Sequence, residues 1–141
     1  MTVLVFGRTG QVATELRALL PAARFVGRDE ADLQNPQACA AIITQTRPSA
    51  VINAAAYTAV DKAESDEDTA TLVNGAAPAA MAAAAAALGV PMVQISTDYV
   101  FAGTGTHAWE PDESVDPQNA YGRSKLAGEA GIRAAGGAHA I

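Results

Sequence analysis

The chain has 141 residues, half of them apolar, with 9 basic and 15 acidic side chains that give a net charge of −6. Its length suits one compact domain, and its negative charge disfavours binding to the phosphate backbone of a nucleic acid. A nucleotide cofactor is not excluded, because a helix N-terminus and one or two arginines can hold a phosphate locally.

Cysteine usage and hydropathy predict a cytoplasmic protein without a membrane span. Cys39 is the only cysteine, so no internal disulfide can form, which fits a reducing compartment. No basic stretch or cleavage site of a secretory leader precedes the apolar residues 3–6. The most apolar stretch, residues 75–95, is rich in Ala and interrupted by Gly and Pro. We therefore expect a helix followed by a buried strand there, and not a membrane helix.

Strands and helices are expected to alternate along the chain. Short apolar runs predict buried parallel strands at residues 3–6, 24–26, 50–52 and 92–95. Helical spacing and propensity predict helices at residues 11–20, 37–46, 61–72, 79–88 and 120–135, with a loop at 103–117. Gly136 and Gly137 end the last helix, and residues 138–141 resemble the start of a further strand. The alternation predicts an α/β fold, a Rossmann-like doubly wound parallel sheet cut short after about five strands.

A glycine-rich turn joins the first predicted strand to the first helix. Residues 7–13 read GRTGQVA, the pattern GxxGxxA. Glycines permit a tight turn and close approach to a pyrophosphate, and the helix N-terminus supplies free N–H groups. Ala13 stands where a third glycine is usual and is small enough for helix–strand packing. The pattern alone also fits an ordinary turn, but its place between strand and helix favours a dinucleotide site.

Arg28 follows the second predicted strand, where the ribose 2′ group of a dinucleotide would lie. An arginine there accommodates a 2′-phosphate, whereas an acid favours NAD. Arg28, helped by Arg8 in the glycine loop, therefore predicts NADPH. Asp29 and Asp32 lie nearby and leave NADH open, as does the alternative that both arginines are solvated surface residues.

Tyr121 and Lys125 stand four residues apart at the start of the last predicted helix and share one face. An ammonium beside a phenol is expected to lower the tyrosine pKa, which makes the tyrosine a usable proton donor. Thr97 follows the fourth predicted strand, at the edge where open α/β sheets bind ligands. Together Thr97, Tyr121 and Lys125 predict a catalytic site.

Four stretches resemble the extended short-chain dehydrogenases/reductases, and among these most closely the dTDP-4-dehydrorhamnose reductases. They are FGRTGQV at residues 6–12, NAAAYTAVDKAES at 53–65, STDYVF at 96–101 and YGRSKLAGE at 121–129. The second and third are quite specific to this reductase group. Related epimerases and dehydratases share the glycine loop and the Tyr–Lys pair, but not the full sequences of these stretches.

The resemblance implies NADPH-dependent reduction of dTDP-4-dehydro-L-rhamnose to dTDP-L-rhamnose, within dTDP-rhamnose biosynthesis. It implies that Tyr121 protonates the keto oxygen, that Lys125 holds the nicotinamide ribose, and that Thr97 and Asp98 meet the dTDP-linked keto-sugar. It places Gly10, Gln11 and Val12 at the pyrophosphate, Asp32 and Leu33 at the adenine, and Ala56, Tyr57 and Thr58 at the ribose and nicotinamide. With the assignments made from the residues themselves, the expected cofactor contacts also include Gly7, Arg8, Arg28, Tyr121 and Lys125.

The main departure from the family is length, because its members have a C-terminal substrate-binding portion about as long as this chain. Residues 1–141 are therefore expected to be an incomplete NAD(P)-binding domain, and turnover by the chain alone stays open. A sugar-nucleotide epimerase and a non-catalytic, cofactor-binding regulatory subunit are the alternative functions. Some members associate Mg²⁺ with dimer contacts, through acids near Glu15 and in the missing portion, so metal dependence and a homodimer also stay open.

Overall fold

The computed structural model describes residues 2–141 and contains one parallel sheet. The strands lie in the order β2-β1-β3-β4-β5. Their bounds are β1 Val3–Phe6, β2 Arg24–Val26, β3 Ala50–Asn53, β4 Met92–Gln94 and β5 His139–Ala140. Because β1 pairs in parallel with both β2 and β3, the sheet runs outward in two directions from its first strand. This order reverses the direction of winding beside β1 and creates a crevice at the carboxyl ends of the strands.

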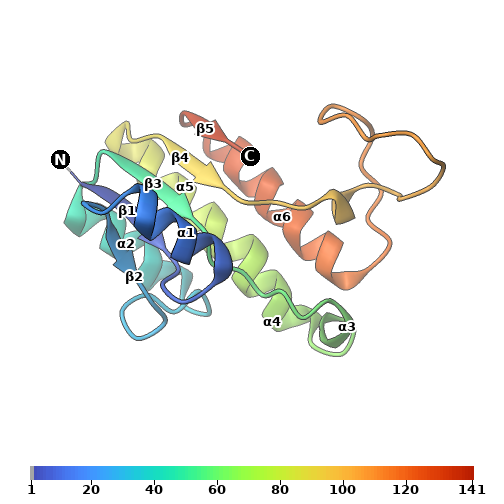
Figure 1. Cartoon of the computed structure of the whole chain (residues 1–141), viewed down its shortest axis with the longest axis horizontal. Helices are drawn as coiled ribbons and strands as arrows, with labels where there is room; N and C mark the ends of the chain where they lie inside the picture. Colours follow the sequence, from blue (N-terminus) through green and yellow to red (C-terminus); the bar gives the residue numbers. More distant parts are fainter. Residues whose placement is uncertain (1) are drawn as a thin grey trace.

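Helices cover both faces of this sheet. Their bounds are α1 Gln11–Leu19, α2 Pro36–Thr46, α3 Val60–Ala63, α4 Glu67–Thr71, α5 Ala77–Leu88 and α6 Ala120–Ala135, with a π-helical segment η1 at Leu72–Ala76 and a 3-10 turn η2 at Asp98–Val100. Helices α2, α5 and α6 pack side by side on one face, and α1 lies on the other (Figure 1). The doubly wound α/β architecture predicted from the sequence is confirmed.

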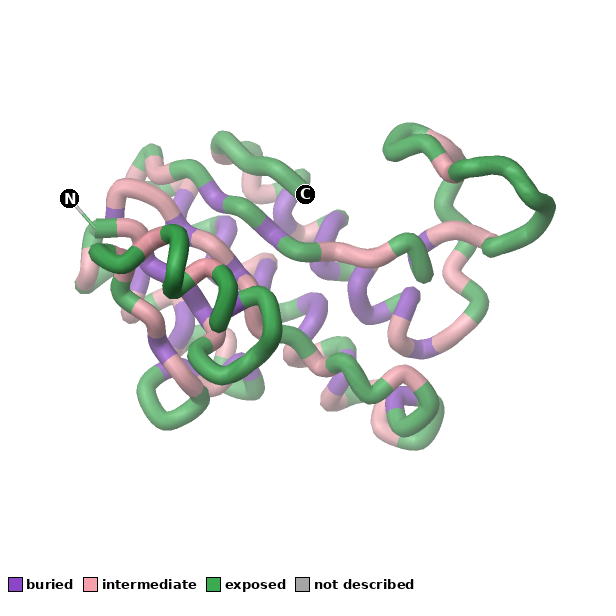
Figure 2. The backbone as a smooth tube through the Cα atoms, in the orientation of Figure 1, coloured by how far each residue is buried: buried purple, intermediate pink, exposed green. Residues whose placement is uncertain are grey.

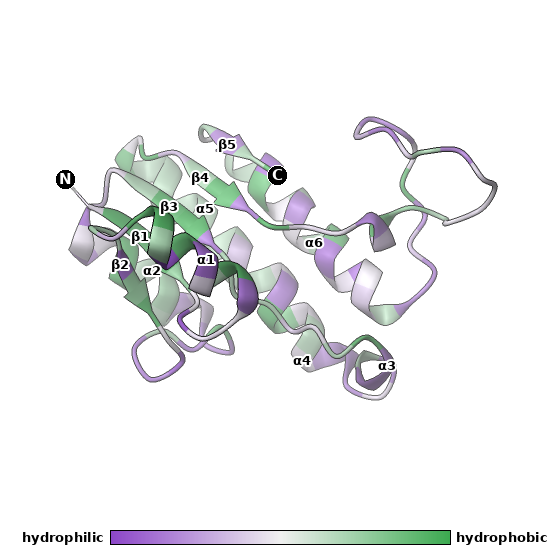
Figure 3. Cartoon of the chain, viewed as in Figure 1, coloured by the Kyte–Doolittle hydropathy of each residue, from purple (hydrophilic) through white to green (hydrophobic). Residues whose placement is uncertain are grey.

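The main core lies between the sheet and the layer of α2, α5 and α6. Its largest fully buried side chains come from β1, β3 and β4 on one side and from the three helices on the other, namely Leu4, Phe6, Val51, Met92, Ile43, Met81 and Ile132. The tube in Figure 2 is most buried where these elements meet, and Figure 3 shows β1, β3 and α5 as mainly hydrophobic. Burial of this apolar surface is the dominant force that holds the helices on the sheet.

The helix that spans Glu67–Leu88 is long and apolar enough by composition to cross a membrane, with a mean hydropathy of 1.4. Core helices of soluble proteins pass the same test. In this fold α5 packs between α2 and α6, and its buried side chains include Met81, Ala82 and Ala85. The predicted helix and buried strand in residues 75–95 are therefore found, as α5 and β4.

The predicted helix at residues 61–72 is broken, which corrects the sequence-based expectation. Helix α3 ends at Ala63, and α4 begins at Glu67. Ser65 donates to the Lys62 carbonyl through its backbone N–H at 3.0 Å and through its hydroxyl at 3.1 Å. Glu64 accepts a hydrogen bond from the Ala120 N–H at 2.7 Å, at the start of α6. The break thus lets a side chain of this segment satisfy a free donor of another helix.

Helix α4 continues through η1 into α5, whereas the sequence predicted a break between helices at residues 72 and 79. Pro78 has no N–H for the Asn74 carbonyl, and an ordinary α-helix would clash there. The segment η1 widens the helix just before Pro78 and keeps it continuous. The Asn74 carbonyl instead faces Gly128 of α6, where a Cβ would collide with the carbonyl oxygen. A small residue at 128 is therefore required for α6 to pack against η1.

Substitution of Gly128 by Ala should destabilise the protein by about 2 kcal/mol, because overpacking a close backbone contact costs roughly 1–3 kcal/mol. The gain in helix propensity opposes this cost by about 1 kcal/mol. Ala130→Gly at the exposed neighbouring face is the control, since it reports helix propensity alone. Denaturant unfolding measures both variants, and an unchanged midpoint for Gly128→Ala would contradict the packing argument.

Candidate active site

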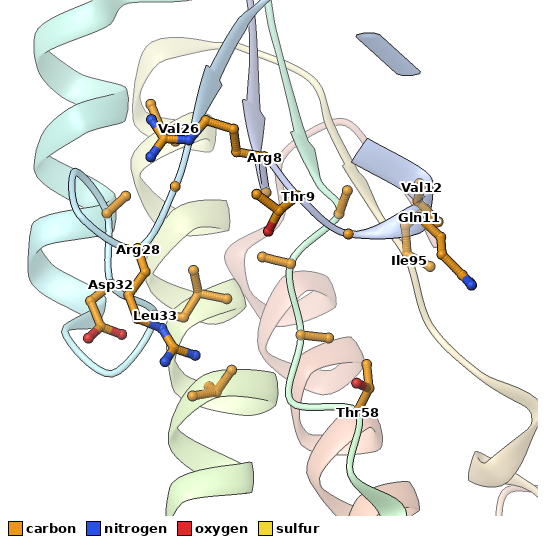
Figure 4. A pocket seen from close by; sticks show the side chains of 18 of the residues that line it. Arg8, Thr9, Gln11, Val12, Val26, Arg28, Asp32, Leu33, Thr58 and Ile95 are labelled. Carbon is orange, nitrogen blue, oxygen red and sulfur yellow. The ribbon is translucent and has the colours of Figure 1, made fainter. Parts of the chain in front are cut away.

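A cavity of about 1040 Å³ lies at the carboxyl ends of β1, β3 and β4, beside the N-terminus of α1. Figure 4 shows Arg28 and Leu33 at one end of it and Gln11 and Ile95 at the opposite end. The sequence-predicted residues that line it are Gly7, Arg8, Gly10, Gln11, Val12, Arg28, Asp32, Leu33, Ala56, Thr58, Tyr121 and Lys125. The fold therefore brings the glycine loop and the Tyr–Lys pair together in one cavity.

Gly7 and Gly10 shape the turn between β1 and α1. Gly7 has a φ of +112°, and a Cβ there would come within 3.3 Å of the Ala54 carbonyl. Gly10 is the N-cap of α1 and makes no side-chain capping bond, and nothing lies within 4 Å of the place where its Cβ would be. The first N–H groups of α1 consequently have no side-chain acceptor at the cavity. This arrangement fits an anionic pyrophosphate.

Two arginines at the β2 end of the cavity differ in their partners. Arg8 Nη2 lies 2.5 Å from Asp29 Oδ1, and Arg8 Nη1 lies 3.4 Å from Glu30 Oε1. The hydrogen bond between Arg8 and Asp29 raises the pKa of the guanidinium and lowers the pKa of the carboxyl. Within residues 2–141 no ion pair engages Arg28. Arg28 is therefore the arginine that is available to a ligand, whereas Arg8 already holds carboxylates.

Lys125 is a buried cation on α6. The helix begins after Asn119, whose side chain accepts a hydrogen bond from the Gly122 N–H at 2.7 Å. Lys125 is only 3% exposed, and its Nζ donates to the Ile95 carbonyl at 2.6 Å. Burial lowers the pKa of Lys125 to about 8, and the negative charge of Glu129 acts in the opposite direction. At neutral pH the ammonium form still predominates.

Tyr121 lies one turn before Lys125, and its phenol is kept protonated. Burial raises the pKa of Tyr121, the Thr97 hydroxyl acts against this rise, and the charge of Asp98 adds to it. The expectation that Lys125 lowers the Tyr121 pKa is wrong here, because the ammonium is turned to the Ile95 carbonyl and burial dominates. The phenol form is the one that a proton donor needs.

Thr97 and Asp98 follow β4, where η2 begins. Thr97 Oγ1 caps η2 by accepting a hydrogen bond from the Tyr99 N–H at 3.2 Å. The Tyr99 ring meets the Tyr121 ring edge to face, with centroids 5.5 Å apart and planes at 80°. Neither Thr97 nor Asp98 lines the cavity itself, although the neighbouring Ser96 does. Both lie close enough to Tyr121 to affect the pKa of its phenol.

Tyr57 does not line the cavity, and the residue that holds its backbone was missed by the sequence analysis. The Tyr57 phenol donates to Asp66 Oδ2 at 3.2 Å, away from the cavity. The buried Asn74 accepts from the Tyr57 N–H at 2.8 Å and donates to the Tyr57 carbonyl at 3.0 Å. Asn74 also donates to Ser124 Oγ at 2.9 Å, and Ser124 donates to the Tyr121 carbonyl at 2.7 Å. This network ties the loop after β3 to the first turns of α6.

The described residues offer no cluster suited to a metal ion. Among residues 2–141, no three His, Cys, Asp or Glu side chains gather closely enough to hold one. Glu15 is exposed on α1. Cys39 is buried, and burial raises the pKa of its thiol to about 11, so the neutral thiol predominates. Of the three residues predicted to be catalytic, Tyr121 and Lys125 line the cavity, and Thr97 lies outside its lining.

A family model for the RmlD substrate binding domain matches residues 1–141. The chain belongs to this family. The dTDP-4-dehydrorhamnose reductase of Burkholderia thailandensis is 47% identical to this RmlD-family chain over 140 residues, which cover 97% of the chain and 47% of that protein. The reductase of Salmonella typhimurium is 43% identical over 140 residues, which cover 94% of the chain and 47% of that protein. The chain thus spans about half the length of these relatives.

Solved structures agree with this family assignment. The crystal structure of dTDP-4-dehydrorhamnose reductase from Bacillus anthracis in complex with NADP has a TM-score of 0.90 and 30% sequence identity to the RmlD-family chain. The match covers 99% of this chain and 52% of that chain. The fold described above is therefore shared with an experimentally determined structure of a dTDP-4-dehydrorhamnose reductase.

Proposed function

We propose that the whole protein reduces dTDP-4-dehydro-L-rhamnose to dTDP-L-rhamnose with NADPH. The observation that carries this proposal is the single cavity lined by the glycine loop, Tyr121 and Lys125 within the described residues. The relatives named dTDP-4-dehydrorhamnose reductase support it, as does the neighbour in complex with NADP. Residues 1–141 would bind the cofactor, and the portion that the relatives have beyond the matched half would complete the sugar site.

A nicotinamide dinucleotide suits the residues around the cavity. The free N–H groups that follow Gly10 would hold the pyrophosphate, because a helix N-terminus favours negative charge. Asp32 and Leu33 would flank the adenine, and Ala56 and Thr58, which also line the cavity, would lie at the ribose and nicotinamide. When bound, the reduced cofactor supplies the hydride.

The residues of the chain would handle the proton. Tyr121 gives its phenolic proton to the keto oxygen as the ketone becomes an alcohol. Lys125, whose Nζ donates to the Ile95 carbonyl, would hold the nicotinamide ribose through another N–H of its ammonium group. The Thr97 hydroxyl donates a hydrogen bond to the same keto oxygen, and Asp98 contacts the sugar. The raised pKa of Tyr121 suits this direction of the reaction, since it keeps the proton in place until the ketone arrives.

Two alternatives predict different outcomes of one assay. A sugar-nucleotide epimerase would use the same Tyr–Lys pair without net oxidation of NADPH, and a regulatory subunit would bind the cofactor without turnover. The decisive experiment mixes the whole protein with NADPH and dTDP-4-dehydro-L-rhamnose and follows absorbance of the cofactor and the sugar product. Stoichiometric oxidation of NADPH with formation of dTDP-L-rhamnose supports the reductase. Failure of the whole protein to oxidise NADPH would overturn it.

Arg28→Asp should weaken NADPH binding by about 10–100-fold, because hydrogen bonds to charged groups contribute roughly 1.5–3 kcal/mol. The physical reason is that Arg28 lines the cavity and is free of ion pairs within residues 2–141, so it can meet a 2′-phosphate. NADH lacks this phosphate and should be affected much less. Calorimetric titration of the chain with each cofactor measures the two dissociation constants.

Arg47→Asp is the matched control, because it makes the same charge change at an exposed position after α2. Residue 47 has a φ of 47°, a conformation that Asp tolerates, so the control should fold. Equal losses of NADH and NADPH affinity in Arg28→Asp would show that Arg28 does not read the 2′-phosphate.

A further inference from the structure

Two charged side chains are buried on the same face of α6. Lys125 is 3% exposed and Glu129 is 6% exposed, and they are the only charged residues buried in the described part of the chain. Their spacing of four residues places them one turn apart. The reaction proposed above uses Lys125 but gives no role to Glu129.

Glu129 and Lys125 bind two consecutive residues that follow β4. Glu129 Oε1 accepts a hydrogen bond from Ser96 Oγ at 2.6 Å, while Lys125 Nζ donates to the Ile95 carbonyl at 2.6 Å. The next residue in the chain is Thr97. Two contacts therefore fix the position of Thr97 relative to α6. Glu129 makes the contact with Ser96, the residue directly before Thr97.

The charge of Glu129 is not explained by the Ser96 contact. A neutral amide would accept the same hydrogen bond, and burial of a carboxylate is costly unless cations surround it. Arg133 Nη2 lies 3.0 Å from Glu129 Oε2, but its side chain is 54% exposed, so solvent screens much of that attraction. The buried cation on the same face is Lys125, and Glu129 is the charged group that stabilises its protonated form.

We propose that Glu129 is a positioning residue for the reaction, which holds Ser96, and through it Thr97, at a fixed distance from α6 and keeps Lys125 in its ammonium form. The inference rests on the proposed function, in which Thr97 and Lys125 act on substrate and cofactor. Glu129 touches neither of these ligands and acts only through its neighbours.

The other charges near α6 are too remote or already occupied to replace Glu129. Helix α5 and η1 carry no ionisable side chain. From α3 and α4, Glu64 binds the Ala120 N–H and Glu67 pairs with Arg123, near the first turn of α6. After β4, Asp98 raises the pKa of Tyr121 but does not affect that of Lys125. Removal of the Glu129 charge therefore leaves Lys125 without its stabilising anion.

The first test measures the titration of Lys125 by NMR, from the ¹³Cε resonance of the 141-residue chain. Glu129→Gln preserves size and the acceptor for Ser96 but removes the charge, so the Lys125 midpoint should fall below its wild-type value. Glu67→Gln makes the same chemical change at a carboxylate that is 44% exposed and should leave the midpoint unchanged. A Glu129→Gln midpoint equal to wild type overturns the electrostatic part of the proposal.

A second measurement uses the unsubstituted chain, so it tests the proposal even if the Glu129→Gln variant fails to fold. The side-chain carboxyl carbon of Glu129 should show an inflection at the pH at which Lys125 titrates, because coupled groups report each other's protonation. Absence of this inflection also overturns the proposal. Both readouts require no cofactor or substrate, so they are independent of whether the whole protein is a reductase.

The second test addresses the position of Thr97 in the whole enzyme. Ser96→Ala removes the hydrogen bond and keeps the Glu129 charge, so kcat should fall by roughly 10-fold as Thr97 loses its alignment, with the KM for NADPH and the pH profile retained. Glu129→Gln should instead move the alkaline limb of the pH profile to lower pH. Loss of kcat and NADPH affinity together in Ser96→Ala, or an unshifted limb in Glu129→Gln, contradicts the assignment.

Discussion

Replacement of Tyr121 by Phe is expected to lower turnover of the whole enzyme by about 10²–10⁴-fold, the usual contribution of a general acid. The phenyl ring preserves the edge-to-face contact with Tyr99, whose centroid lies 5.5 Å away, so the site should keep its shape. Only the proton donor is lost, and NADPH affinity should stay near that of the unsubstituted protein. Steady-state oxidation of NADPH and a binding titration separate the two effects.

Tyr99→Phe provides the matched control for this substitution. It removes a phenolic hydroxyl from the partner ring, and Tyr99 is 46% exposed at the rim, so turnover should change little. If Tyr121→Phe retained nearly full activity, another acid would supply the proton. Asp98, which adjoins Thr97 and influences the pKa of Tyr121, would then be the first residue to substitute.

Local sequence signals predicted most of the fold, because they depend on neighbours within one element. The apolar run at Val3–Phe6 is β1 with the predicted bounds, and Gly136 ends α6 in the left-handed conformation at a φ of 71°. The break between α3 and α4 was not predictable in this way. It depends on Glu64 reaching the Ala120 N–H, 56 residues further along the chain, and no local pattern encodes that partner.

Most of the predicted site residues line the cavity, but Tyr57, Thr97 and Asp98 do not, and the electrostatics of the site were not predictable from the sequence. The four-residue spacing placed Tyr121 and Lys125 on one face of α6, and both line the cavity. The sequence could not tell that Lys125 would be buried and bonded to the Ile95 carbonyl. Asn74 escaped notice because an isolated Asn inside an apolar helix has no distinctive pattern. Its one signal is Pro78, four residues later, which disturbs the helix at that point.

Lys125→Met should raise stability and weaken cofactor binding at the same time. The pKa of Lys125 is lowered from 10.5 to about 8 in the folded protein, so burial of its charge opposes folding at neutral pH. The shift corresponds to an upper bound of about 3 kcal/mol. Loss of the hydrogen bond to the Ile95 carbonyl and of the buried cation on the same face as Glu129 reduces this gain in stability. We expect a net increase in the free energy of unfolding of about 1–2 kcal/mol at pH 7.

The stability effect of Lys125→Met should depend on pH. Between pH 8 and pH 10.5 the unfolded chain holds a proton on Lys125 that the folded chain has released, so the penalty in the unsubstituted protein disappears as pH rises through this window. The stability difference between Lys125→Met and wild type should therefore be largest below pH 8 and shrink toward pH 10.5. Denaturant unfolding at pH 7 and pH 10 measures this stability difference, and a difference that grows with pH would contradict the prediction.

At pH 7 the same variant should bind NADPH about 10–100-fold more weakly, because the ammonium no longer donates to the ribose.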